Sequence, residues 1–146
     1  MEFYDIIFLC ETHAMVETKL SLPGYIPFNN PCNVSNQSHP RGGTIFFVKQ
    51  SLVKYITSIN ISFNDFIILN LVNKNVICGT YIPPNDSTYM KDHFEYLDTL
   101  IQYAQLYKQR MLVIGDENCR LGKLDDLNRY SYTANPDETI NNNGTK

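Results

Sequence analysis

Residues 59–84, INISFNDFIILNLVNKNVICGTYIPP, decide the fold that we expect of this chain. The stretch holds three β-rich apolar runs, at residues 59–63, 66–72 and 76–82, and Asn, Asp and Lys residues fill the two short gaps between them. Short polar gaps of this kind are typical of tight turns. Because successive strands joined by tight turns pair antiparallel, the stretch predicts an antiparallel meander.

The segments on either side extend this prediction. Two prolines end the third run, and residues 86–108 then predict a helix because five apolar residues recur on one helical face: Met90, Phe94, Leu97, Ile101 and Ala104. Residues 5–10 and 111–114 are short unbroken apolar runs, a pattern typical of strands buried on both faces. Residues 44–48 predict another strand, and residues 21–43, rich in Pro, Gly, Asn and Ser, predict a long irregular loop.

Strands followed by a long helix and a further strand indicate an α/β or α+β class, with sheet packed on sheet and helices outside. Hydrophobic residues make up 43% of the 146 residues, which excludes wholesale disorder. The formal charge of -3 gives no support for nucleic-acid binding by general electrostatics, although carboxylates gathered around a metal ion also count as acidic.

The four cysteines form no C-x-x-C pair and are too sparse for a secreted disulfide scaffold, so we expect reduced thiols. No apolar run reaches the ~18 residues of a membrane span, and the first residues do not have the pattern of a signal peptide. We therefore expect a soluble intracellular protein with no membrane partner.

Polar groups that directly follow apolar strands are the candidate functional residues: Glu11, Tyr81, and Asp116 with Asn118. Mg²⁺ prefers oxygen ligands and is often held by one or two carboxylates. Phosphodiester hydrolysis also needs a base and hydrogen-bond donors, which these side chains can provide. Each has an ordinary structural explanation as well, namely a solvated loop carboxylate, a core tyrosine with its hydroxyl at the surface, and a turn.

Several motifs in chain order carry a resemblance to a known family. They are DIIFLCET at residues 5–12, Arg41-Gly42-Gly43 before a strand, YIPP at 81–84, IGDENCRLG at 114–122 and NNNG at 141–144. Together they resemble endonuclease/exonuclease/phosphatase domains, and they look most like the endonuclease of LINE-type (non-LTR) retrotransposons. The resemblance covers nearly the whole chain and implies a four-layered α/β sandwich of the deoxyribonuclease-like type, with two mainly antiparallel sheets and outer helices.

The resemblance also implies roles for the candidate residues. Glu11 would bind the catalytic Mg²⁺, which Mn²⁺ could replace, and Tyr81 would lie against the scissile phosphate. Asp116 would activate or orient the attacking water, and Asn118 would contact the phosphate or keep the metal site in order. The complete form would act on DNA phosphodiesters, with the reverse transcriptase domain of a parent polyprotein as its partner and the nucleus as its compartment.

The chain departs from the family pattern at both ends. The family's first strand, which carries an Asn at the metal site, and its closing Ser-Asp-His segment have no counterpart, and His13, His39 and His93 do not replace that His. Glu117 adds a negative charge where the family usually has an apolar residue. We therefore expect residues 1–146 to be a partial domain with little or no hydrolytic activity alone, and whether the chain is an enzyme stays open.

Two other functions remain open at this point. The chain could be a non-catalytic remnant that serves as a binding or structural protein, in which case divalent cations would not affect it. It could also be a phosphodiesterase or phosphatase of the same fold that acts on a phospholipid or inositol phosphate, because fold does not fix the substrate.

Overall fold

The chain folds into two β-sheets and one long helix in a computed structural model that describes residues 4–32, 42–61, 65–83 and 87–118. The first sheet has the order β1-β3-β2, and the second has the order β4-β5-β6-β7. The strands are β1 (Ile6–Cys10), β2 (Tyr25–Asn30), β3 (Thr44–Lys49), β4 (Ile56–Asn60), β5 (Phe66–Leu71), β6 (Asn75–Tyr81) and β7 (Arg110–Asp116). The helix is α1 (Ser87–Leu106), and short 3-10 turns span Gln50–Tyr55 and Val72–Lys74.

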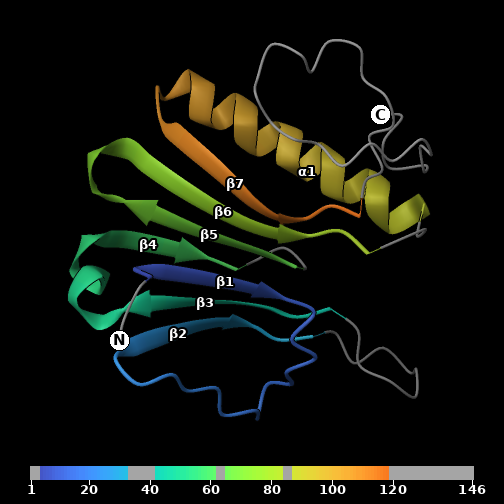
Figure 1. Cartoon of the computed structure of the whole chain (residues 1–146). Coiled ribbons are helices and arrows are strands. Elements are labelled where there is room, and N and C mark those ends of the chain that lie inside the picture. The colour runs from blue at the N-terminus through green and yellow to red at the C-terminus, as the bar shows by residue number, and fades with distance from the viewer. Residues whose placement is uncertain (1–3, 33–41, 62–64, 84–86, 119–146) are drawn as a thin grey trace, which may run out of the picture.

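The elements form three layers (Figure 1). The three-stranded sheet packs face to face on the four-stranded sheet, and α1 covers the outer face of the four-stranded sheet. All pairs are antiparallel except β6 with β7, which is parallel. The described chain is therefore a mixed α and β fold, as expected, and the predicted meander is present as β4-β5-β6. Its first strand was predicted at residues 59–63, but β4 begins earlier, at Ile56, and ends at Asn60.

The core between the sheets is formed by alternate residues of the two central strands. Phe46 and Val48 of β3 meet Ile67 and Leu69 of β5, and all four are buried. Gly79 of β6 makes this close approach possible, because a Cβ there would lie 2.3 Å from the Phe8 ring. The sheets therefore pack tightly where the strands lead toward the candidate site.

A second core lies between the four-stranded sheet and α1. It contains Phe66 and Ile68 of β5 with Val76 and Cys78 of β6, and Tyr96, Leu97 and Leu100 of the helix pack against it. His93 is fully buried there, with its ring 5.3 Å from that of Phe66. The predicted apolar face is therefore confirmed at Leu97 and at the buried Ala104, but it is wrong at Ile101, which is 38% exposed because His93 and Leu100 face the sheet instead. The side chain of Met90 lies outside the described residues.

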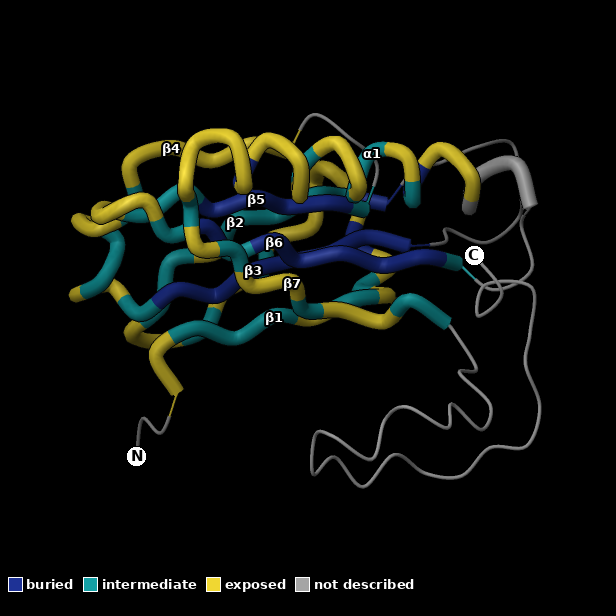
Figure 2. Tube along the Cα trace, turned by 90° about the horizontal axis from the view of Figure 1, so that it is seen from above, coloured by how far each residue is buried: buried dark blue, intermediate teal, exposed yellow. Residues whose placement is uncertain are grey.

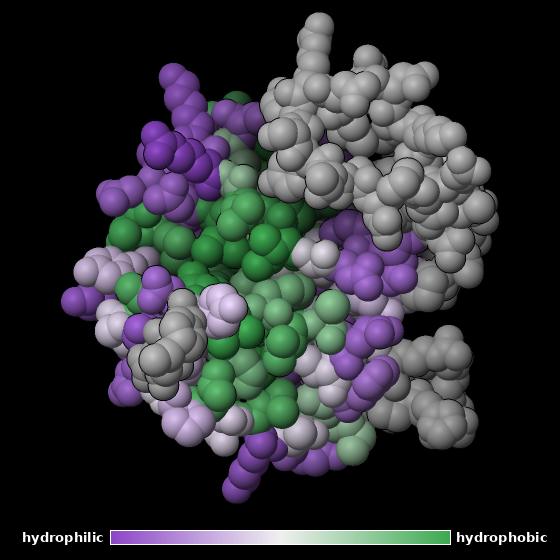
Figure 3. Space-filling view, in the orientation of Figure 1, coloured by the Kyte–Doolittle hydropathy of each residue, from purple (hydrophilic) through white to green (hydrophobic). Residues whose placement is uncertain are grey.

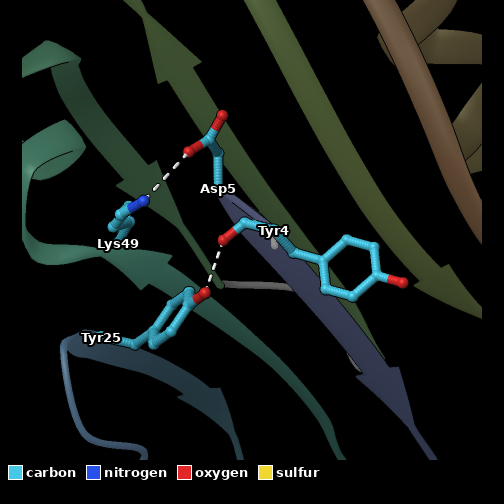
Figure 4. A network of polar contacts seen from close by, with 4 residues as sticks. All are labelled: Tyr4, Asp5, Tyr25 and Lys49. Carbon is cyan, nitrogen blue, oxygen red and sulfur yellow. Dashed lines mark hydrogen bonds and ion pairs between the residues drawn. The ribbon is translucent and has the colours of Figure 1, made fainter. Parts of the chain in front are cut away.

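Polar contacts fix the start of β1 to its neighbours (Figure 4). The backbone N–H of Lys49 donates to the carbonyl of Asp5 at 2.9 Å, and the Lys49 ammonium lies 3.8 Å from the Asp5 carboxylate. The Tyr25 hydroxyl donates to the carbonyl of Tyr4. These contacts join the two residues just before β1 to β2 and β3, and they agree with the register in which β1 pairs with β3.

The prediction of an irregular loop over residues 21–43 is wrong for residues 25–30, which form β2. Pro27 lies inside this strand opposite Phe47. Proline removes one backbone donor, but an edge strand has a row of donors that need no partner, and β2 is at the edge of its sheet. The turn-forming residues on either side of this strand made the whole segment resemble a loop in the sequence.

The prediction that β1 and the strand after α1 are buried on both faces is also wrong. Both are edge strands within the part of the chain that the structure describes, and Figure 2 shows buried β3, β5 and β6 between more exposed neighbours. Leu9 of β1 is 46% exposed, and Leu112 and Val113 of β7 are 55% and 36% exposed. An unbroken apolar run indicates a strand but does not reveal whether neighbours cover it.

Within the described ranges, no helix has both the length and the apolar character needed to cross a membrane.

Candidate active site

Three strands bring the candidate residues together at one end of the two sheets. Tyr81 is the last residue of β6 and pairs in register with Asp116, the last residue of β7. Glu11 follows β1 in the other sheet, and its carboxylate accepts a hydrogen bond from the Tyr81 hydroxyl. The Tyr81–Glu11 contact therefore joins the two sheets where β1, β6 and β7 end.

The loop that carries Glu11 is held by a pair of glycines. The backbone N–H groups of Thr12 and His13 donate to the carbonyls of Gly43 and Gly42 at 3.1 and 3.0 Å. Both glycines have positive φ angles, and a Cβ on Gly43 would lie 2.8 Å from the Thr12 hydroxyl. Only glycine fits this close approach without strain. In the loop that the two glycines hold, Glu11 has a left-handed backbone conformation with a φ of 51°.

Asp65 connects this loop to Tyr81, and the sequence did not identify it. Its carboxylate accepts the backbone N–H of Gly43 at 3.0 Å, and its carbonyl accepts the backbone N–H of Tyr81 at 3.1 Å. In the sequence, Asp65 was simply one of the polar residues between two strands. The contacts that distinguish it join residues far apart in the chain, which no local pattern reveals.

Asp116 and Asn118 form a compact turn after β7. The backbone N–H of Asn118 donates to the Asp116 carboxylate, and the Asn118 side-chain amide donates to the carbonyl of Ile82, both at 2.8 Å. The carbonyl of Asp116 accepts the backbone N–H of Ile82 at 2.9 Å. The turn is therefore attached to the end of β6, and the exposed Asp116 carboxylate is held next to Tyr81.

The charges at this end of the molecule are negative. Burial raises the pKa of Tyr81, and the hydrogen bond to Glu11 together with the charges of Glu11, Asp116 and Asp65 raises it further. Burial and the charge of Asp116 likewise raise the pKa of Cys10, with a smaller effect from Glu11. Carboxylates from both sheets thus act on the same two side chains, so this end attracts cations.

Glu117 directly follows Asp116 and is half-buried. Burial, followed by the charge of Asp116, raises its pKa to about 7. Burial also raises the pKa of Cys78 to about 12, with a smaller effect from the charge of Glu117. The negative charge expected beside the site is therefore reduced, because Glu117 is partly protonated near neutral pH.

The raised pKa of Glu117 predicts a pH-dependent stability. A carboxyl with a pKa raised from 4.5 to about 7 binds more protons when folded, so its contribution to stability falls as pH rises through that window. Between pH 5 and pH 8 we expect the melting temperature of the native chain to drop by several degrees relative to Glu117→Gln. Thermal unfolding of both proteins across this range measures the difference, and a difference that does not vary with pH would contradict the prediction.

The structure thus brings together Glu11, Tyr81, Asp116 and Asn118. His13 is exposed in the same loop as Glu11, whereas His93 belongs to the helix–sheet core. Arg41, His39 and the motif residues 119–122 and 141–144 lie outside the described residues. Among the described residues, no group of three or more His, Cys, Asp or Glu side chains is arranged to hold a metal ion.

No protein-family model matches the chain, and no curated protein matches it.

Proposed function

We propose that Glu11, Tyr81, Asp116 and Asn118 form the catalytic end of a divalent-metal-dependent phosphodiesterase domain of the endonuclease/exonuclease/phosphatase type. The parent would be a LINE-type retrotransposon endonuclease that acts on DNA in its complete form. The observation that carries the proposal is the contact between Tyr81 and Glu11, which joins β6 to β1 beside Asp116. Two sheets packed face to face with a helix outside also support a deoxyribonuclease-like sandwich.

The charge of the site favours a hard cation. Its side chains offer carboxylate oxygens, and every charge that shifts the pKa of Tyr81 belongs to a carboxylate. A phosphate would be repelled by this set unless a cation neutralised it. Glu11 and Asp116 would hold Mg²⁺ or Mn²⁺, which when bound supplies charge stabilisation to a phosphoryl oxygen.

The hydrogen bonds suggest a distinct task for each residue. The raised pKa of Tyr81 keeps its hydroxyl protonated, so it serves as a donor that orients Glu11 or a phosphate oxygen. The Asp116 carboxylate, fixed by the Asn118 N–H, would orient water and accept a proton. The side-chain amide of Asn118 is engaged with Ile82, which favours a role in positioning Asp116 over contact with the phosphate.

Plasmid nicking tests this function. The family's Ser-Asp-His segment has no counterpart in the sequence, so we expect slow nicking even with protein in excess over DNA. The nicking should require Mg²⁺ or Mn²⁺, disappear in Asp116→Ala and persist in Asp92→Ala, which removes an exposed carboxylate on α1. Nicking that Asp116→Ala leaves intact would contradict the proposal. A chain that neither nicks DNA nor binds either cation would be a non-catalytic remnant.

A further inference from the structure

Strand β7 has an open edge. Among the residues that the structure describes, it pairs only with β6, so the backbone groups on its other side have no strand partner. Leu112 and Val113 are exposed on opposite faces of this strand. Figure 3 shows apolar surface in the region where Figure 1 places β7 and β1. An open edge with exposed apolar side chains is a template for a further strand.

The sequence of β7 is complementary to itself. In an antiparallel pair, directly opposite residues lie on the same face of the sheet. A two-fold axis normal to the sheet must therefore pass midway between the two copies of one residue, which then lie opposite each other. An axis at Val113 pairs all seven residues of the strand. Leu112 then lies opposite Ile114, and Arg110 lies opposite Asp116.

We propose that β7 pairs antiparallel with β7 of a second copy of this chain around a two-fold axis at Val113. The pairing joins two four-stranded sheets into one continuous sheet and covers Leu112 and Val113 of both copies. Arg110 and Asp116 are both exposed, and the symmetric pair contains two Arg110–Asp116 contacts, one on each side of the axis.

The same reasoning excludes β1 as the pairing edge. Asp5 lies just before this strand and Glu11 just after it. Antiparallel pairing of β1 with a second β1 would bring these carboxylates toward one another, and like charges across a strand pair are destabilising. The charge pattern therefore selects β7 over β1, although both strands have open edges among the described residues.

Charge reversal in two separate chains tests the pairing. Arg110→Glu and Asp116→Lys each place like charges opposite one another in their own homodimer, and we expect self-association at least about tenfold weaker for each. An equimolar mixture of the two variants restores both opposite-charge pairs, so it should associate about as tightly as the native chain. Sedimentation velocity over a range of concentrations measures all three samples.

A disulfide tests the position of the axis. In the background Cys10→Ser and Cys119→Ser, Val113→Cys places two thiols opposite one another, at the roughly 4.5–5.5 Å Cα separation of an antiparallel pair, which a disulfide accepts. Mild oxidation should give a covalent dimer, whereas Leu9→Cys on β1 should give none. A native chain that sediments as a monomer throughout, or association that survives both charge reversals, would overturn the proposal. Neither experiment measures hydrolytic activity, and the Val113→Cys experiment leaves Asp116 unchanged, so it tests the pairing separately from the proposed function.

Discussion

Gly115→Ala is expected to destabilise the fold by about 3 kcal/mol or more. A Cβ at this position would lie 1.8 Å from the carbonyl oxygen of Thr80 and 3.1 Å from its methyl group. Thr80 pairs with Gly115 in the parallel ladder between β6 and β7. Because the carbonyl belongs to the backbone, it cannot move aside as the end of a flexible side chain can, so the strands must separate next to Tyr81 and Asp116.

Chemical denaturation measures this loss of stability. Ser58→Ala is the control, because it changes an exposed residue of β4 in the same sheet and should cost less than about 1 kcal/mol. A Gly115→Ala protein as stable as the control would show that the two strands do not approach as closely as the structure places them.

The double variant Glu11→Gln, Asp116→Asn is expected to lower the affinity for Mn²⁺ by tenfold or more. Carboxylates that bind a cation directly contribute at least as much as the groups that hydrogen-bond to such ligands, whose loss costs about 10–100-fold. Both substitutions keep the shape of the side chain, so the Tyr81 hydroxyl and the Asn118 N–H retain their acceptors. The two residues come from different sheets, so each single variant should also weaken binding.

Isothermal titration with Mn²⁺ and Mg²⁺ measures these affinities, and the rise in melting temperature with added cation gives a second readout. Asp92→Asn with Asp98→Asn is the matched control, because it removes two carboxylates from α1. Equal losses of affinity in the control and in the site variant would mean that the cation responds only to net charge.

The regular part of the fold could be predicted from the sequence. The meander β4-β5-β6 and helix α1 follow from apolar periodicity and from turn-forming residues, and these signals are local. The wrong predictions concern which strands lie beside one another in the folded chain. Pro27 concealed β2 because a local pattern does not show which strand is at an edge, and the apolar runs of β1 and β7 did not reveal how exposed these strands are.

In the candidate site, too, the local features could be predicted from the sequence and the contacts between distant segments could not. Glu11, Tyr81 and Asp116 could be selected because each is placed directly after or at the end of a strand, where a rigid element can hold a polar group. The roles of Asp65 and Gly43 could not be predicted from the sequence, because they depend on hydrogen bonds between segments that meet only in the folded chain. The assignment of functions to these residues still depends on the resemblance in the motifs.

Paramagnetic broadening by Mn²⁺ in a ¹H–¹⁵N spectrum tests most directly whether one cation lies between the two sheets. We expect substoichiometric Mn²⁺ to broaden the amides of Glu11, Tyr81 and Asp116 and their neighbours together, and to spare the acidic residues of α1. Broadening centred on α1, or on Asp116 without Glu11, would contradict a shared cation site.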